Sequence, residues 1–225
     1  MPELTEITPN VFQFGRAANQ FLLKTAEGEL TLIDAGMPGS TKATLNAVAA
    51  LGHEPTALKH ILVSHADVDH IGSLAGIKAA TGATVYAGAE SKTHIENRTA
   101  PPHIPPPMSW MMGPVTRLLL KPTTVDQVFA DRDTLDAVGG IQAIHAPGHT
   151  PDNFVFYWPL AGVLFAPDLL FHMGNSLSLS PALFSWDRAT TVASAKKALA
   201  LDPAVVCVGH GAPVRTPSPD VDALR

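Results

Sequence analysis

The chain has few of the features that mark secreted, disulfide-bonded or membrane proteins. It contains one cysteine, Cys207, which excludes an internal disulfide and stands in an apolar run typical of a buried strand. No run approaches the roughly 18 consecutive apolar residues of a membrane span. The first residues lack a basic segment followed by an apolar one, so we expect no signal peptide. These absences predict a cytoplasmic protein without a membrane partner.

Charge is also scarce. Charged residues make up 16% of the 225 positions, and the formal net charge is -5. A nucleic-acid-binding face would be basic, so this balance favours a small-molecule substrate over a nucleic-acid partner. The hydrophobic fraction of 46% suffices for a sizeable core, and the length fits a single domain over residues 1–225.

Strand and helix patterns alternate along the chain. Short apolar runs predict strands at 11–14, 21–24, 30–33, 60–64, 84–86, 127–129, 141–144, 153–157, 163–166 and 204–208. Helices are predicted over 40–51, 70–81 and 187–201. Asp187 stands near the start of the last helix and two lysines near its end, which matches the helix dipole. Alternation of this kind indicates an α/β fold.

Residues 99–124 differ from the rest. Five prolines lie between positions 101 and 107, and apolar residues follow at 110–112 and 118–120. A long irregular segment within a compact domain is usually functional or disordered. Its apolar content favours either a packed, lid-like insertion or the contact of a homodimer. We expect Trp110 and Met111, with His172, to line a substrate pocket; an ordinary surface position is the alternative for His172. His103 lies in this segment and receives no role.

Four residues with metal-binding side chains occur within six positions after the predicted strand 60–64. They are His65, Asp67, Asp69 and His70. Further side chains of this kind directly follow later predicted strands: His149, Asp168 and His210. Glycines flank several of them and allow sharp turns near a site. Imidazoles and carboxylates without thiolate are the ligands of zinc, iron or manganese.

These motifs, taken in order, resemble the metallo-β-lactamase superfamily. The matching segments are Leu32–Gly36, Ser64–His70, Pro147–Thr150, Asp168 and Gly209–Gly211. The resemblance implies an α/β fold of the αββα sandwich type, with two mixed β-sheets flanked by helices. It also implies a site for one or two metal ions. His65, Asp67 and His149 would hold the first ion, and Asp69, His70 and His210 the second. Asp168 would bridge them, and Asp34 would hold the ligand loop in shape without binding metal.

Residue 67 departs from the usual motif, His-x-His-x-Asp-His, because it is aspartate. Diiron flavoproteins of the superfamily carry a carboxylate there, so Asp67 can serve as a ligand. We expect zinc as the bound metal. An oxygen donor at residue 67 raises the share of iron or manganese relative to zinc. Two alternatives stay open: Asp67 is a solvated loop residue, or a single ion binds Asp69, His70 and His210.

The resemblance implies metal-assisted hydrolysis. Two ions about 3.5–4 Å apart lower the pKa of a shared water from ~15.7 toward ~7, and the resulting hydroxide attacks a carbonyl or phosphoryl centre. Asp69 would orient the hydroxide and pass a proton to the leaving group. We expect an ester, thioester or lactone as substrate.

Other functions compete with this one. The 15 residues after His210 fall short of the helical extension of glyoxalase II enzymes, and secreted zinc β-lactamases have cysteine in place of Asp168. One alternative is a small phosphodiesterase. Another is an iron-dependent redox enzyme, similar to diiron oxygen or nitric oxide reductases or to persulfide dioxygenases. A non-catalytic member of the fold is a third.

Overall fold

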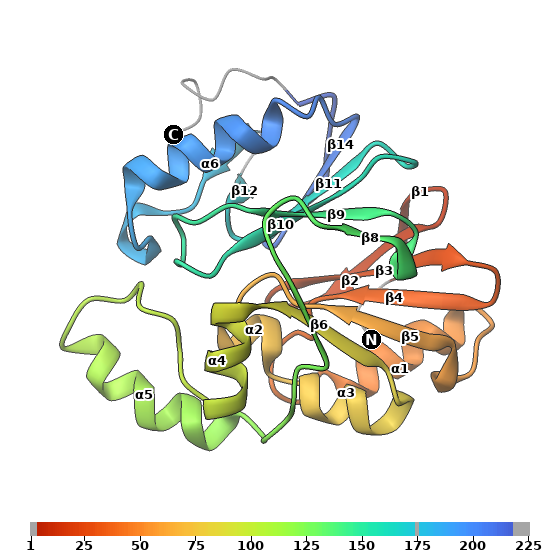
Figure 1. Ribbon diagram of the computed structural model, residues 1–225, viewed down its shortest axis with the longest axis horizontal. Helices are drawn as coiled ribbons and strands as arrows, with labels where there is room; N and C mark the ends of the chain where they lie inside the picture. The colour runs from red at the N-terminus through yellow and green to blue at the C-terminus, as the bar shows by residue number, and fades with distance from the viewer. Residues whose placement is uncertain (1–3, 174–175, 218–225) are drawn as a thin grey trace. The chain divides into compact units, whose positions relative to one another are not determined.

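The computed structural model describes residues 4–173 and 176–217, which form two compact units (Figure 1). The first unit contains the described residues up to 100 and residues 110–129. The second contains residues 101–109 and the described residues from 130 onward. The prediction of one domain over the whole chain stays a prediction. Two segments used in the sequence analysis lie partly outside the described ranges. They are the N-terminal residues and the 15 residues after His210.

A seven-stranded mixed sheet forms the centre of the first unit, with its strands in sequence order. Neighbouring strands from β1 to β4 are antiparallel, whereas β4 to β7 are parallel. The strands are β1 (Thr5–Thr8), β2 (Val11–Gly15), β3 (Asn19–Ala26), β4 (Glu29–Ile33), β5 (Leu58–Leu62), β6 (Thr84–Gly88) and β7 (Gln127–Phe129). Because β4 and β5 are parallel, their carboxyl ends lie at the same edge of the sheet.

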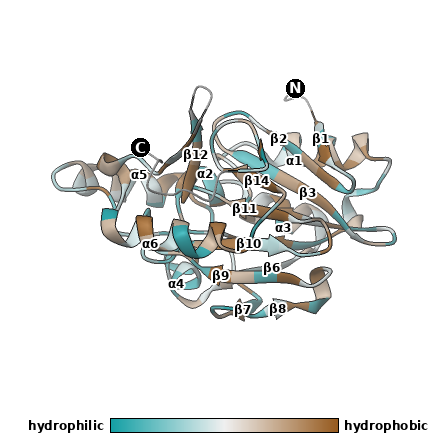
Figure 2. Cartoon of the chain, turned by 90° about the horizontal axis from the view of Figure 1, so that it is seen from above, coloured by the Kyte–Doolittle hydropathy of each residue, from teal (hydrophilic) through white to brown (hydrophobic). Residues whose placement is uncertain are grey.

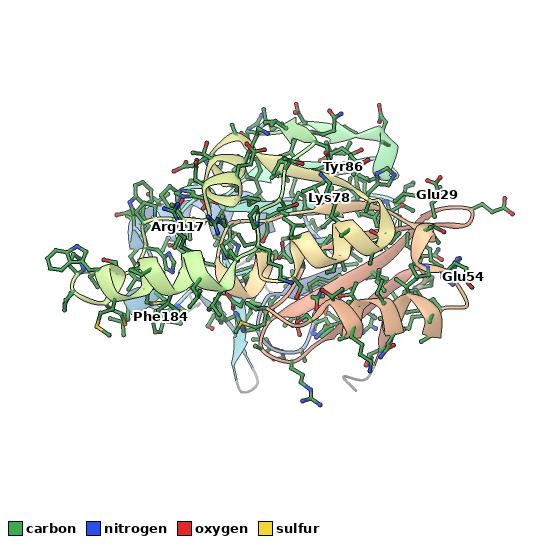
Figure 3. The ribbon with its side chains drawn as sticks, turned by 90° about the horizontal axis from the view of Figure 1, so that it is seen from below. Glu29, Glu54, Lys78, Tyr86, Arg117 and Phe184 are labelled. Carbon is green, nitrogen blue, oxygen red and sulfur yellow. The ribbon has the colours of Figure 1, made fainter. Side chains whose placement is uncertain are left out.

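Helices cover one face of this sheet (Figure 1). They are α1 (Thr41–Ala50), the 3-10 turn η1 (Pro55–Ala57), α2 (Val68–Ile71), α3 (Leu74–Thr81) and α4 (Ala89–Asn97). Val48 of α1 and Ile77 of α3 are fully buried and share one apolar core with Leu32 and Ile61 of the sheet. Lys78 extends from α3 (Figure 3), and its Nζ donates hydrogen bonds to Asp126 Oδ1 at 2.8 Å and to the Thr124 carbonyl at 3.0 Å. These bonds hold the residues before β7 against the helix.

The predicted helix 70–81 is divided in the structure. It is interrupted at Gly72 and Ser73, between α2 and α3. A side chain at position 72 would collide with Pro38, so glycine is required there. The Ser73 hydroxyl donates to the Met37 carbonyl at 2.6 Å and accepts from the Ser40 backbone N–H at 2.7 Å. The interruption therefore fixes the loop that precedes α1.

The sequence predicted an irregular segment over residues 99–124. The structure contains a helix within this segment. Met108–Leu119 forms the helix α5, which begins in the second unit and continues in the first. Pro114 lies inside α5, and that proline obscured the helix in the sequence.

A six-stranded mixed sheet forms the centre of the second unit, in the order β15-β14-β11-β10-β9-β8. Its strands are β8 (Thr134–Leu135), β9 (Ile141–His145), β10 (Phe154–Trp158), β11 (Val163–Ala166), β14 (Val205–Val208) and β15 (Val214–Arg215). β11 and β14 are parallel, and β9 is antiparallel to the intervening β10, so β9, β11 and β14 end at one edge. A separate antiparallel pair joins β12 (Leu170–Met173) to β13 (Ser176–Leu179).

The helix α6 (Arg188–Leu199) packs on this second sheet. Hydrophobic and hydrophilic positions alternate along it (Figure 2), and Ala195, Ala198 and Leu199 join the apolar core with Val206 of β14. The Asp187 side chain accepts a hydrogen bond from the Thr190 N–H at 2.7 Å and so caps the start of the helix. The other short elements are the 3-10 turns η2 (Asp136–Val138) and η3 (Ala182–Phe184).

The predicted fold class is confirmed: each unit has a large mixed sheet with helices. Among the described residues, no helix is long and apolar enough to cross a membrane.

Candidate metal centre

The first half-site, which we define as Asp34, His65, Asp67, Asp69 and His70, lies in the first unit where β4 and β5 end. Asp34 is fully buried and has a positive φ of 59°, uncommon for a residue other than glycine. Its Oδ1 accepts the Ser64 backbone N–H at 2.9 Å, and its Oδ2 accepts the Ser64 hydroxyl at 2.8 Å. Asp34 thus ties the two strand ends together.

The same carboxylate orients the two histidines. Asp34 Oδ2 lies 2.8 Å from His70 Nδ1 and accepts a hydrogen bond from the ring N–H. Because the Ser64 hydroxyl donates to Asp34, its oxygen accepts from His65 Nδ1 at 2.9 Å. Both rings are fully buried. Each imidazole therefore carries its proton on Nδ1 and presents Nε2 as the metal-binding atom, as metal-ligating histidines commonly do.

Carboxylates lie beside both of these Nε2 atoms. His65 Nε2 is 3.5 Å from Asp67 Oδ2, and His70 Nε2 is 3.8 Å from Asp69 Oδ2. The two ring centroids are 4.2 Å apart. Four ligands at about 2.1 Å from one zinc ion are spaced about 3.4 Å from one another. The observed distances approach that spacing, so these residues fit a cation between them.

Asp67 is not a solvated loop residue. It is only 9% exposed, and although it occupies the N-cap position of α2, its carboxylate makes no capping hydrogen bond. Its Oδ2 lies instead beside the Nε2 atom of His65. This placement favours the ligand interpretation over the solvated one.

The second half-site, which we define as His149, Asp168 and His210, lies in the second unit. Its residues follow β9, β11 and β14, whose ends share one edge of the sheet. Asp168 Oδ2 is 3.5 Å from His149 Nε2, and Asp168 Oδ1 is 3.3 Å from His210 Nε2. One carboxylate with a different imidazole at each oxygen has the form of a bridging ligand, so this donor set also fits divalent cations.

Tight backbone packing positions Asp168. It has a positive φ of 54°, as Asp34 does at the end of its own strand. A Cβ at position 209 would collide with the Asp168 side chain, so only glycine lets β14 approach so closely. Phe171 stacks on the His210 ring with centroids 5.1 Å apart. The backbone and one aromatic ring thus determine where these ligands lie.

The start of α6 holds the loop that carries His149. The Trp186 N–H donates to the His149 carbonyl at 2.8 Å, and the Asp187 N–H donates to the Gly148 carbonyl at 3.0 Å. The buried Ser180 hydroxyl lies 3.1 Å from His149 Nδ1, which again leaves Nε2 for a metal. Ser180 was not identified from the sequence because it lies 31 positions away from its partner.

His103 was also missed, because the proline-rich segment carried no ligand pattern. Its ring centroid lies 5.0 Å from that of His149, with an interplanar angle of 46°. Its Nδ1 lies 3.1 Å from the Pro101 carbonyl and donates a hydrogen bond to it. A third histidine therefore adjoins the second half-site, next to His149.

The other sequence-derived site residues lie elsewhere. His145, which ends β9, donates from Nε2 to the Pro151 carbonyl at 2.9 Å and belongs to neither half-site. His172 bonds the Ala212 carbonyl through Nδ1 at 2.8 Å, and its N–H donates to the His210 carbonyl at 3.1 Å. It therefore braces the segment around His210. Trp110 and Met111, in the first unit, are 74% and 73% exposed.

An open, mostly apolar pocket of about 390 Å³ lies within the second unit. None of the three residues predicted to line a substrate pocket contributes to it. Its lining comes from the proline-rich segment and from η3 with the residues after it: Pro102, His103, Ile104, Pro105, Ala182, Leu183, Ser185 and Trp186. Through His103 and Trp186 the pocket adjoins His149.

Comparison with known proteins gives a family match and several relatives. A family model described as the metallo-beta-lactamase superfamily matches residues 14–210. The protein YobT of Bacillus subtilis is 31% identical over 85% of this chain and 82% of its own length. The probable metallo-hydrolase YflN of the same organism is 26% identical over 81% and 75%. A hydroxyacylglutathione hydrolase of Fuscovulum blasticum is 31% identical over 84% of this chain, which spans 61% of that relative.

Solved structures of metallo-beta-lactamase proteins have a similar fold. A metallo-beta-lactamase of Cronobacter sakazakii described by its HARLDQ motif is 25% identical, with a TM-score of 0.70 over 92% of this chain and 78% of its own. A metallo-beta-lactamase family protein of Thermus thermophilus has a TM-score of 0.73 over 94% and 76%, and at 22% identity it supports the fold alone.

Proposed function

The chain belongs to the metallo-beta-lactamase superfamily, and we propose that it is a metal-dependent hydrolase in which the two half-sites together bind two divalent ions. His65, Asp67 and His149 would hold the first ion. The second would bind Asp69, His70 and His210. Asp168 would bridge the two. The observation that carries this proposal is the shared geometry of the half-sites, in which oriented imidazoles present Nε2 beside carboxylates 3.3–3.8 Å away.

Bound divalent ions would lower the pKa of water and polarise the scissile carbonyl. The residues of the chain then divide the remaining work. Asp34 holds His70 in the tautomer that binds metal, and Ser180 contacts His149 Nδ1 and so leaves Nε2 for the ion. Asp69 is suited to move the proton, because its side chain is 29% exposed, against 12% for Asp67 and 6% for Asp168. A carboxylate with access to solvent can take a proton from water and deliver it to the leaving group.

The pocket beside His149 supports a substrate with an apolar portion. Its walls are prolines, Ile104, Leu183 and the Trp186 ring, which offer contact to an acyl chain or an aromatic ring and few fixed hydrogen bonds. Relatives named hydroxyacylglutathione hydrolase suggest thioester chemistry. The proposed substrate is accordingly a small ester, thioester or lactone with an apolar acyl group.

Zinc is the first choice for both ions, and Asp67 raises the share of iron or manganese because it replaces an imidazole by a hard oxygen donor. Elemental analysis of the purified protein determines both the metal and the number of ions. Zinc or manganese with ester turnover supports hydrolysis. Two irons with an oxygen- or nitric oxide-dependent reaction would support the redox alternative instead.

The test of function is a panel of a small lactone, a thioester and a phosphodiester, assayed with the metal-loaded protein. Asp69→Asn should lower kcat by about 10²–10⁴-fold, the usual contribution of a positioned acid or base. His149→Ala should lose metal together with activity. The exposed Asp136→Asn is the matched control and should behave like the original protein. Full turnover in both the Asp69 and His149 variants would contradict the proposal.

A further inference from the structure

We infer that His103 is a metal ligand: it supplies, from the proline-rich segment, an imidazole to the ion that His149 holds. The inference rests on the proposed function, because it concerns the same metal centre. It adds a ligand from a segment outside the strand-end motifs that supply the rest of the donor set.

The first argument is the position of the His103 nitrogen. One ring nitrogen of His103 and one of His149 lie at most 4.8 Å apart. The rings are tilted by 46° and not stacked face to face, with centroids 5.0 Å apart. Two imidazoles that bind one ion point their nitrogens at a common point and keep their faces apart. The observed tilt and spacing allow this convergence with a small adjustment of the ring.

The second argument is the hydrogen bond on the far side of the ring. His103 Nδ1 donates to the Pro101 carbonyl at 3.1 Å, so its proton is on Nδ1 and Nε2 carries the lone pair. His65 and His70 follow the same pattern, with Ser64 and Asp34 as their partners, and the Ser180 hydroxyl lies 3.1 Å from His149 Nδ1. A backbone carbonyl is a usual partner for the second nitrogen of a metal-binding histidine. His103 therefore has the tautomer that binding requires.

The third argument is the backbone that carries His103. Pro101 is buried, and prolines at 102 and 105 restrict the backbone on both sides of the histidine. A chain restricted in this way loses little entropy when its side chain is fixed on an ion. His103 is itself only partly exposed. The segment thus presents the imidazole in a preset position.

A third imidazole on the first ion would also account for the unusual donor at residue 67. In the motif that residues 65–70 resemble, that position is histidine, and here it is Asp67. With His103 bound, the first ion would still have three imidazoles, and the shorter carboxylate of Asp67 would be a weaker fourth donor. Restoring histidine at residue 67 should then make His103 dispensable for metal binding.

The experiment measures metal binding and does not depend on turnover. Apparent Co²⁺ and Zn²⁺ affinities are determined by competition with a chromophoric chelator, the number of ions by elemental analysis, and the coordination by the visible spectrum of the Co²⁺ protein. The variants are His103→Ala, His103→Gln, Asp67→His and the double variant Asp67→His with His103→Ala. His94→Ala removes a partly exposed histidine of α4 and is the control. Circular dichroism of the metal-free proteins verifies that each variant is folded.

Both His103 variants should weaken one ion site by more than about 100-fold, beyond the roughly 10–100-fold expected for a residue that only orients a ligand. Their Co²⁺ spectra should change. The double variant should regain most of the lost affinity.

Two of the following three results would overturn the inference, and the other would remove only its account of residue 67. Unchanged affinity and spectrum in folded His103 variants would remove His103 from the ligand set, and a raised KM for apolar substrates would then make it a pocket residue. Loss of affinity without recovery in the double variant would exclude compensation for residue 67. If the original protein bound no ion, the proposed function itself would fail.

Discussion

Asp34 Oδ2 lies 2.8 Å from His70 Nδ1, and both side chains are fully buried. The same carboxylate accepts two hydrogen bonds from Ser64, so all of these contacts of Asp34 are with the loop that carries the candidate ligands. Asp34 belongs to one strand end and the motif 64–70 to the next. Because this single carboxylate joins them, the geometry of the first half-site depends on a residue that need not touch metal.

Asp34→Asn should lower metal affinity by about 10–100-fold, the usual effect of changing a residue that orients a ligand. An amide can donate where the carboxylate accepts, so His70 would lose its preferred tautomer. Competition with a chromophoric chelator measures the affinity. Exposed Asp136→Asn is the control. Equal affinities in the two variants would mean that His70 is oriented by other contacts.

Gly209→Ala should disturb Asp168, because the added Cβ would collide with its side chain. Overpacking of this kind costs about 1–3 kcal/mol. Gly113→Ala is the matched variant: it lies in α5, and nothing lies within 4 Å of its added Cβ. Alanine should stabilise that helix by about 0.5–1 kcal/mol. Urea unfolding of both variants tests the contrast, and effects of the same sign would contradict it.

His60 should make the protein less stable in mild acid. Burial lowers the pKa of His60 below its usual value of 6.5, against the opposing effect of Glu29 at 4.0 Å, and Lys59 lowers it further. The folded protein then binds fewer protons here than the unfolded chain. The contribution of His60 to stability is complete above pH 6.5 and declines as pH falls from 6.5 to the lowered pKa.

Urea unfolding between pH 5 and 8 measures this dependence, with His60→Gln as the comparison. Because other histidines are buried too, the informative quantity is the difference between the two proteins. That difference should change only below about pH 6.5, near the ordinary pKa of histidine. A difference that is constant with pH would show that His60 does not titrate differently in the folded state.

Cys207 should be unreactive in the folded protein. It is fully buried on β14, and burial strongly raises the pKa of its thiol, so little thiolate forms at neutral pH. Ellman's reagent should therefore modify it only in step with unfolding by urea. Rapid modification of the native protein would require local opening of β14, and Cys207→Ala would be the control without a thiol.

Much of the second half-site could be predicted because its candidate ligands directly follow strands. His149, Asp168 and His210 come after β9, β11 and β14, and strand direction brings the ends of these strands to one edge. The apolar runs that form those strands are evident in the sequence. Asp34 and Asp168 could be identified as site residues because each of them follows a strand. Their positive φ values could not be predicted from the sequence.

Residues 99–124 were harder to interpret. The apolar content suggested a wall for substrate, yet Trp110 and Met111 are highly exposed, and the pocket is lined by residues 102–105 instead. Their partners are at 182–186, some 80 positions later in the chain. Hydrophobicity indicates that a side chain favours burial, but not which distant segment will cover it. The helix α5 was likewise concealed by Pro114.

The sequence by itself determined which candidate ligands the chain carries and that they stand at strand ends, because side-chain chemistry and strand periodicity are local properties. The departure at Asp67 was also evident from it. Tertiary structure alone decided which partners orient those ligands: Ser180 reaches His149 across 31 positions, and the proline-rich segment brings His103 beside it. Such contacts depend on packing between segments that are distant in the chain, and no local pattern encodes them.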